Sequence, residues 1–269
     1  MTSTPSTAGH SDERPVRLDV SGLKKTYTTK KGDVPVIDDL TFDLRQGEIA
    51  CIVGPSGTGK TTLLKCLAGL QPITSGQATI DGHVIDGPPE ELALVFQEYT
   101  RSLMPWLSVE RNVELPLRHL SLSAEERRQR AASSLEAVGM AEAASKYPWQ
   151  LSGGMQQRVA IARAVAYRPG VLIMDEPFAS VDAQTRFELE DLCLRIREQF
   201  DMTILVVTHD IDESVYLSNR VIVLGQRPAK VTDVIPIDFD GPRDQLTTRA
   251  LPRFAQLRSE IFELIRKAG

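Results

Sequence analysis

A single stretch indicates the architecture of this chain: Gly54-Pro55-Ser56-Gly57-Thr58-Gly59-Lys60-Thr61. It fits the pattern G-x-x-x-x-G-K-[ST], whose glycines let the backbone wrap closely around phosphate oxygens. A mostly apolar run, Glu48–Val53, precedes the stretch and predicts a buried strand, and Lys60–Leu70 follows with leucines at helical spacing. This pattern requires such a setting of strand, glycine-rich turn and helix. We therefore predict a loop that binds the phosphates of a nucleoside triphosphate.

Each part of this loop has an expected role. The backbone N–H groups and the positive end of the following helix would meet the negative charge of the phosphates. Lys60 would reach the outer phosphates as a point charge, and the hydroxyl of Thr61 is placed to ligate Mg²⁺. The residues expected to contact the nucleotide run through the loop to one residue beyond it: Gly54, Pro55, Ser56, Gly57, Thr58, Gly59, Lys60, Thr61 and Thr62.

Composition narrows the class of protein. The chain has 269 residues, of which 42% are hydrophobic and 25% charged, as in an ordinary soluble globular protein of one or two domains. Its net charge of −5 argues against nucleic acid as a partner, because phosphate-backbone binding needs a basic face. The three cysteines fit no zinc or redox spacing, which favours reduced thiols in the cytoplasm.

No apolar run approaches the roughly 18–20 residues that cross a bilayer, so we expect a chain that does not span a membrane. The first 15 residues are rich in Ser, Thr and Pro and lack the apolar stretch of a signal peptide. We interpret them as a disordered tail.

The order of elements predicts an α/β core with an insertion. Residues 108–168 show helical patterns and no convincing strand. After them a strand over Val171–Met174, a helix over Ala183–Phe200 and a strand over Thr203–Val207 alternate, which implies parallel strands joined by crossovers. Near the N-terminus, Asp81-Gly82 predicts a tight hairpin turn. A last helical pattern lies within Asp238–Gly269.

Two acidic residues follow the Val171–Met174 run and indicate how a nucleotide bound by the loop would be hydrolysed. An acid at the tip of such a strand, beside a phosphate loop, holds Mg²⁺ directly or through water, and Asp175 fits that role. Glu176, one residue further, points elsewhere and can take a proton from an attacking water. The simpler alternative is a pair of solvated acids at a strand end.

The segment Leu151-Ser152-Gly153-Gly154-Met155-Gln156-Gln157-Arg158 resembles the signature of ATP-binding cassette (ABC) ATPases. Other motifs of that family follow in its order, and the resemblance covers about Val16 to Lys230. Tyr27 resembles the aromatic residue that stacks on adenine, Gln97 the Q-loop glutamine, Asp182 the D-loop acid and His209 the switch histidine. Taken alone, each of these residues would more simply be structural.

The resemblance implies a P-loop NTPase (RecA-like) α/β core with an N-terminal antiparallel β subdomain and an inserted α-helical subdomain. We expect the tail at 1–15 and the ATPase domain at 16–230, with the core and β subdomain at 16–97 and 169–230. The helical subdomain would be 98–168, and a C-terminal extension with a helix would be 231–269. That helix is expected to pack on the cassette or on a partner copy.

The resemblance also implies a mechanism in which two cassettes dimerise head to tail around ATP. The signature residues Ser152, Gly153, Gly154 and Gln157 would contact the ATP of the partner copy. The expected catalytic residues are Glu176, His209, Lys60 and Gln97, and the expected Mg²⁺ ligands are Thr61, Gln97 and Asp175. Asp182 would tie the two sites together, although Ser180-Val181 replaces the common Ala-Leu before it. Every hydrolytic position carries the expected residue type, which predicts an active ATPase.

Four further segments resemble importers of the nitrate, sulfonate and taurine kind. They are Ser102–Leu107, Asn112–Leu117, Asp182–Arg186 and Thr208–Leu217. The first two, which follow Gln97, lie where import cassettes accept the permease, or else belong to the core of the helical subdomain. The implied partners are a permease and a separate solute-binding protein, at the cytoplasmic face of the membrane. The alternatives are a non-transport ABC ATPase of the repair or translation kind and a nucleotide-binding scaffold without turnover.

Overall fold

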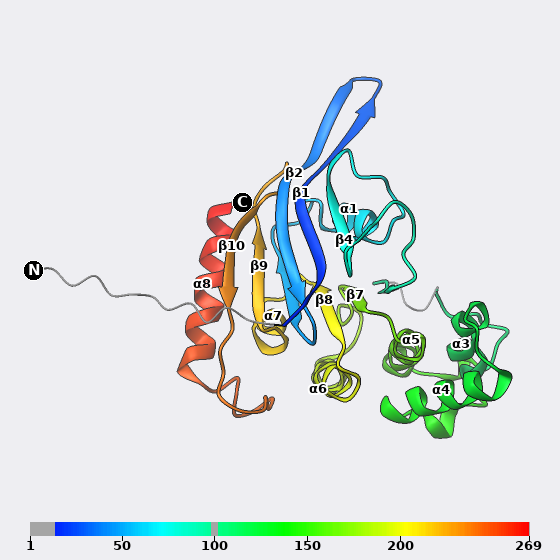
Figure 1. Ribbon diagram of the computed structural model, residues 1–269. Coiled ribbons are helices and arrows are strands. Elements are labelled where there is room, and N and C mark those ends of the chain that lie inside the picture. The colour runs from blue at the N-terminus through cyan, green and yellow to red at the C-terminus, as the bar shows by residue number, and fades with distance from the viewer. Residues whose placement is uncertain (1–13, 98–101, 269) are drawn as a thin grey trace, which may run out of the picture.

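The computed structural model describes residues 14–97 and 102–268, and it is built around a six-stranded sheet. Five strands are parallel and the edge strand β10 is antiparallel, in the order β10-β9-β3-β8-β7-β6 (Figure 1). The strands are β3 (Ile49–Val53), β6 (Leu92–Val95), β7 (Val171–Asp175), β8 (Thr203–Val207), β9 (Arg220–Leu224) and β10 (Val231–Pro236). The expected parallel α/β core is confirmed.

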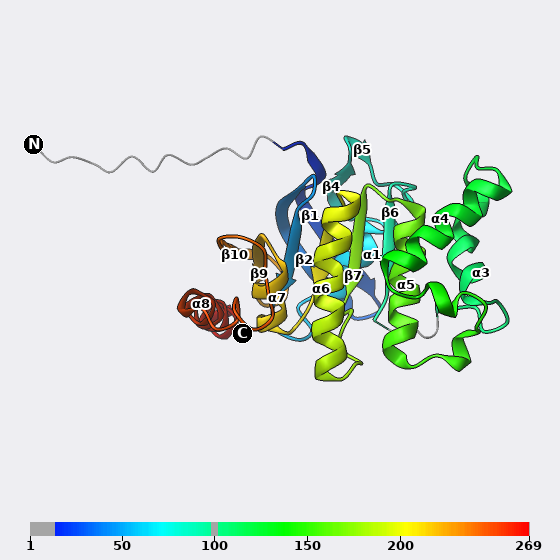
Figure 2. The same cartoon turned by 90° about the horizontal axis from the view of Figure 1, so that it is seen from below.

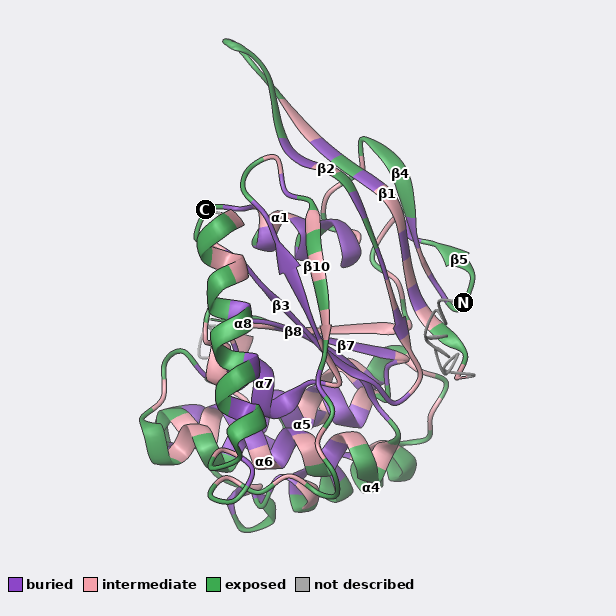
Figure 3. Cartoon of the chain, turned by 90° about the vertical axis from the view of Figure 1, so that its left-hand side faces the viewer, coloured by how far each residue is buried: buried purple, intermediate pink, exposed green. Residues whose placement is uncertain are grey.

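Both faces of this sheet are buried, which explains why its strands read as continuous apolar runs. Along β3 the side chains alternate between two cores: Ile49, Cys51 and Val53 face one, and Ala50 and Ile52 face the other. In Figure 3 the central strands β3, β7 and β8 are buried along most of their length. The three cysteines are free and buried, so they serve as core residues.

A second, antiparallel sheet covers one face of the first. Its strands β1 (Val16–Thr29), β2 (Gly32–Arg45), β4 (Ser75–Ile80) and β5 (His83–Val84) have the order β2-β1-β4-β5. The helix α1 (Lys60–Leu67) packs into the same core. The predicted hairpin is present between β4 and β5, and Asp81 and Gly82 both have positive φ, at 49° and 82°. Figure 1 shows β1 and β2 of this sheet next to β8 and β9 of the large sheet, with which they share a core.

The inserted segment is helical, as its sequence pattern predicted. Its α-helices are α3 (Val109–Glu114), α4 (Ala124–Ala137) and α5 (Gly153–Tyr167), and short 3₁₀ turns cover Leu115–His119, Ala141–Ala143 and Pro148–Gln150. No strand occurs within residues 102–168. At the start of α4, Ser123 and Glu126 bond to each other's backbone N–H groups in a capping box. Figures 1 and 2 show α3 and α4 at one end of the molecule.

Three helices cover the other face of the large sheet and its edge. They are α6 (Ala183–Phe200), α7 (Ile211–Leu217) and α8 (Pro252–Ala268). In Figures 1 and 2, α8 lies beside β10 at the end opposite α3. Its buried residues Phe254, Leu257 and Ile261 pack into the core, so this helix lies on the cassette itself. Within residues 14–97 and 102–268, none of the helices is long and apolar enough to traverse a bilayer.

One boundary expected from the sequence does not follow the structure. We expected an extension to begin at residue 231, but β10 pairs with β9 from Val231 onward and therefore belongs to the large sheet. Half-buried and exposed side chains alternate along β10, which is typical of an edge strand. Residues 1–13 of the expected tail lie outside the described part of the chain.

Arg220 joins the two sheets. Its Nε lies 2.6 Å from Oε1 of Glu48, just before β3, and its Nη1 lies 3.1 Å from Oδ1 of Asp43 on β2. The Glu48 side chain is only 4% exposed, so its charge depends on this guanidinium. Removing one partner of a buried ion pair leaves an uncompensated buried charge, which is strongly destabilising.

We predict that Arg220→Met lowers the free energy of unfolding by about 3 kcal/mol, because it leaves Glu48 without its partner. The matched control is Arg17→Met, which removes the more exposed pair between Arg17 and Asp81 and should change stability by about 0.5 kcal/mol or less. Urea unfolding of both variants measures the difference. Equal losses in the two variants would contradict this assignment.

Candidate functional site

The loop between β3 and α1 is shaped by two glycines. Gly59 precedes α1 with φ of +114°, and a Cβ at this position would lie 2.9 Å from Cγ1 of Val36. At Gly54 a Cβ would lie 2.7 Å from the carbonyl oxygen of Leu224 in β9. The loop therefore passes so close to β2 and β9 that larger residues cannot take these places.

Lys60 supplies a cation from inside this loop. Its Nζ donates to the carbonyl oxygens of Gly54 at 2.7 Å and of Pro55 at 3.0 Å. Burial lowers the pKa of Lys60, while the charges of Glu176 and Asp175 act in the opposite direction. Ser56 and Gly57 are exposed around it. A poorly solvated ammonium within an exposed, glycine-rich loop is a site for an anion.

Asp175 and Glu176 stand at the carboxyl end of β7, as predicted. Burial raises the pKa of Asp175, and the neighbouring charge of Glu176 raises it further. Glu176 has φ of +43°, and its backbone N–H donates to the carbonyl of Val207 at 2.7 Å. A left-handed conformation costs a non-glycine residue roughly 1–2 kcal/mol. This strain breaks the alternation of the strand and redirects the Glu176 side chain.

The structure brings Gln97 and His209 to the carboxylate of Glu176. Nε2 of Gln97 donates to Oε2 of Glu176 at 3.0 Å, and Nδ1 of His209 lies 3.2 Å from Oε1. These three residues follow β6, β7 and β8, which are neighbours in the sheet. The sequence motifs predicted each of these residues separately, and the fold places Gln97 and His209 on either oxygen of the Glu176 carboxylate. Such an arrangement can hold and deprotonate a water molecule.

The expected Mg²⁺ ligands offer hard oxygen atoms: the hydroxyl of Thr61, the carboxylate of Asp175 and the amide oxygen of Gln97. Among the described residues, no group of three His, Cys, Asp or Glu side chains could hold a metal ion alone. Oxygen donors of this kind fit Mg²⁺, which keeps waters and shares phosphate oxygens rather than occupying an all-protein cage. The donor set therefore fits the ion, provided that a nucleotide contributes phosphates.

The signature residues lie at the start of α5. Oγ of Ser152 accepts a hydrogen bond from the backbone N–H of Met155 at 3.3 Å, and Ser152 and Gly153 are exposed. No hydrogen bond or ion pair among the described residues joins them to the loop Gly54–Thr61. Gln157 differs from our expectation, because its side chain is fully buried and its amide atoms have no hydrogen-bond partner. It would have to leave the core to contact another chain.

Two other predicted residues have partners within this chain that the sequence analysis did not identify. The carboxylate of Asp182 caps α6 and accepts from the backbone N–H of Thr185 at 3.0 Å, and the hydrogen bonds from Thr185 lower its pKa. The D-x-x-T spacing is itself a capping signal. Tyr27 donates its hydroxyl hydrogen bond to Gln71, and Nζ of Lys25 lies 4.9 Å from the centre of the Tyr27 ring.

Sequence reasoning also missed a pair beside the predicted switch histidine. Asp210 caps α7 by accepting from the backbone N–H of Glu213 at 3.1 Å, and it forms an ion pair with Arg186 of α6 at 2.9 Å. An acid directly before a helical run is a recognisable cap. Its link to α6 has no local signal in the sequence.

Comparisons with known proteins agree with this geometry. The sequence model of the ABC transporter family matches residues 37–179. The chain is 43% identical over 266 residues to the nitrate import ATP-binding protein NrtD of Synechococcus elongatus, which covers 97% of this chain and 95% of that one. It is 37% identical over 252 residues to the aliphatic sulfonates import ATP-binding protein SsuB of Bacillus thuringiensis subsp. konkukian, with coverage of 94% and 97%.

Among solved structures, the fold matches a dimeric ATP-binding cassette in a post-hydrolysis state, bound to ADP and phosphate. The TM-score is 0.70 at 30% identity, and the match covers 82% of this chain and 99% of that one. The phosphate loop, the acids after β7 and the helical insertion thus occur together in a chain that is similar to such proteins along nearly its whole length. The chain belongs to the ABC transporter family, as an ATP-binding cassette ATPase.

Proposed function

We propose that this chain is the ATP-hydrolysing subunit of an importer that takes up a small solute through a separate permease. The observation that carries the proposal is the Glu176 carboxylate, held between Gln97 and His209 beside the phosphate loop. The two relatives named above are import ATP-binding proteins for nitrate and for aliphatic sulfonates. By that analogy we place the transported solute among small anions of this kind.

Hydrolysis would begin with the phosphates of ATP seated on the N–H groups of Gly57–Thr62. Lys60 would exchange its bonds to the carbonyls of Gly54 and Pro55 for the outer phosphates. Mg²⁺, when bound, neutralises phosphate charge, and Thr61, Asp175 and Gln97 would hold it. Glu176 would take a proton from the attacking water, and His209 would donate a hydrogen bond to the γ-phosphate.

A second copy of the chain would complete the site. The loop Gly54–Thr61 and the exposed signature residues Ser152 and Gly153 lie on separate parts of the chain, so a head-to-tail dimer can place them on opposite sides of one ATP. The matched cassette is itself dimeric. In this arrangement Asp182, exposed at the start of α6, would face the partner copy.

The segment after Gln97 supports docking on a permease. Leu103 is 2% exposed and belongs to the core, whereas Trp106 is 71% exposed. Within Ser102–Leu107, Leu103 therefore fits the interpretation as core of the helical subdomain. Trp106 fits the interpretation as a docking surface, because its side chain is available to a partner. An exposed large aromatic side chain is suited to an interface. We place the chain at the cytoplasmic face of the membrane, with a separate solute-binding protein as a third component.

We predict that Glu176→Gln retains ATP binding but lowers the turnover rate by about a hundredfold or more, because it removes the general base while preserving shape. Phosphate release and equilibrium ATP binding, measured on the same preparation, separate the two effects. Glu125→Gln, which changes an exposed carboxylate on α4, is the matched control and should leave both unchanged. Normal turnover in Glu176→Gln would rule out the base assignment.

The importer role is tested by recovering the tagged chain from the membranes of its own cells in mild detergent. We predict that a multi-span permease co-purifies, and that Trp106→Ala loses it while still binding ATP. Leu246→Ala removes an equally prominent exposed side chain at a distant position and is expected to retain the permease. Recovery of nucleic acid or ribosomes instead of a permease would favour the non-transport alternative.

A further inference from the structure

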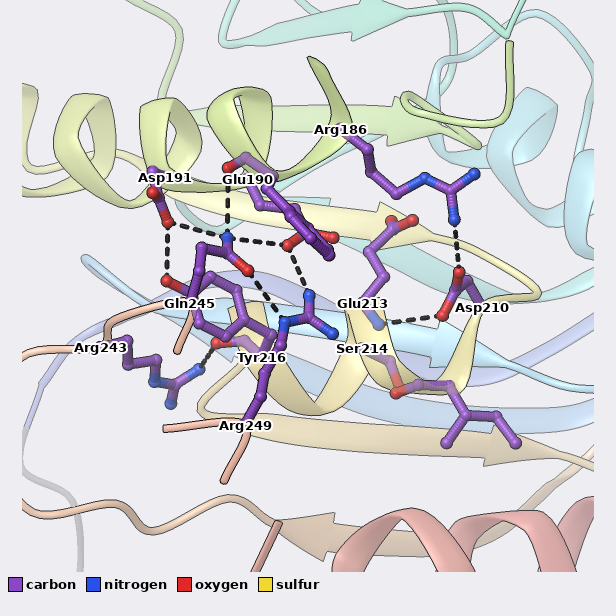
Figure 4. Close-up of polar contacts among 12 residues, drawn as sticks. Arg186, Glu190, Asp191, Asp210, Glu213, Ser214, Tyr216, Arg243, Gln245 and Arg249 are labelled. Atoms are coloured by element: carbon purple, nitrogen blue, oxygen red, sulfur yellow. Dashed lines mark hydrogen bonds and ion pairs between the residues drawn. The ribbon is translucent and has the colours of Figure 1, made fainter. Parts of the chain in front are cut away.

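The segment 239–251, between β10 and α8, crosses α6, which follows the D-loop residue Asp182, and α7, which follows His209. Figure 4 shows its side chains Arg243, Gln245 and Arg249 reaching α6 and α7. This segment lies outside residues 37–179, which the family model matches. Its hydrogen bonds and ion pairs end on α6 and on α7, the helix that follows His209.

Arg249 is the centre of these contacts. Its Nη2 lies 2.6 Å from Oε2 of Glu190 on α6, whose side chain is 1% exposed. The guanidinium carbon also lies 4.8 Å from the ring centre of Tyr216 on α7, and 4.9 Å from that of Phe187 on α6. One planar cation therefore holds the two helices by an ion pair and by contacts with aromatic rings.

Gln245 reinforces the same junction. Its Nε2 lies 3.0 Å from Oε2 of Glu190 and 2.9 Å from Oδ1 of Asp191, and its Oε1 accepts from Nε of Arg249 at 2.8 Å. Asp191 also accepts a hydrogen bond from the hydroxyl of Tyr216 at 2.6 Å. The last turn of α7 is thereby tied to two consecutive acids of α6 (Figure 4).

The first turn of α7 is tied to α6 as well. Arg186, one turn before Glu190, forms the ion pair with Asp210, the residue that follows His209. Between the two attachments lies Glu213, which is buried, and burial raises its pKa well above the ordinary value. Burial thus favours the neutral carboxyl at the centre of the junction. The helix α7 has only seven residues, so its position depends on tertiary contacts rather than on its own stability. These polar partners add to the burial of Val215, Tyr216 and Leu217 in the core.

We propose that Arg249 and Gln245 are positioning residues for ATP hydrolysis, because they fix α7 on α6 and so hold His209 against Glu176. Catalysis depends steeply on such placement, since a displacement of about 1 Å can cost roughly a hundredfold in rate. The same attachment links α6, which Asp182 caps, to α7, which follows His209. The inference concerns the hydrolytic cycle and is independent of which permease the chain serves.

The first test is Arg249→Met in the full-length chain, assayed with saturating and limiting MgATP. We expect kcat to fall about tenfold while KM for ATP changes less than about twofold, because the phosphate loop is untouched. Arg253→Met is the matched control, since it removes an exposed ion pair with Asp238 in the same region. It should leave both constants unchanged.

A second variant separates positioning from stability. Arg249→Met leaves Glu190 buried without its cation, which lowers the melting temperature, and the double variant Glu190→Gln/Arg249→Met removes that charge. We expect the double variant to regain most of the melting temperature but not the lost kcat. Arg249→Lys should recover part of kcat, because it restores the charge without the planar fork.

Gln245→Ala is the mildest variant, and it should lower kcat about threefold with KM unchanged, through loss of its hydrogen bonds. The proposal is overturned if kcat returns together with the melting temperature in the double variant. It is equally overturned if folded Arg249→Met and Gln245→Ala hydrolyse ATP at the unaltered rate, or if kcat and ATP binding fall together.

Discussion

A parallel sheet places the carboxyl ends of all its strands at one edge, and the residues proposed here to hydrolyse ATP depend on that constraint. The phosphate loop follows β3, and Gln97 follows β6. Asp175 is the last residue of β7, Glu176 comes directly after it, and His209 follows β8. Open α/β sheets bind ligands at this edge. Four segments spread over about 150 residues of sequence can act on one phosphate chain only because the sheet aligns them.

The edge is also where the chain accepts locally unfavourable features. Glu176 adopts a left-handed backbone, Lys60 is buried against carbonyl oxygens, and Asp175 carries a raised pKa beside another acid. Each of these features is costly in an isolated peptide, and the packed strands below them hold them in place. A bound nucleotide would offer each of them an opposite charge or a metal ion, so the strain is consistent with a preorganised site.

Much of this arrangement could be predicted from short-range patterns. The loop Gly54–Thr61, the hairpin at Asp81-Gly82 and the capping box of Ser123 depend on residues a few positions apart, and the structure contains the hairpin and the capping box. The meeting of Gln97 with Glu176 could not be predicted from the residues alone, because 79 positions separate them. Their contact follows from the order of strands in the sheet.

Three features of the structure were not predicted from the sequence, because they depend on contacts between distant residues. The inward orientation of Gln157, the pairing of β10 with β9 and the contacts of Arg249 with α6 and α7 are all set by tertiary packing. Neither periodicity nor motif spacing carries that information. Tertiary packing also determines which groups remain exposed to a partner, as the burial of Gln157 shows.

The phosphate loop and the signature lie on separate parts of one chain, so we propose that each ATP site is built from two copies. The most direct test is the turnover rate per chain, measured on the purified protein without permease over a wide range of protein concentration. We predict that the rate per chain rises with concentration and levels off once the chain is dimeric. A rate per chain that is constant down to concentrations at which the protein is monomeric would contradict it.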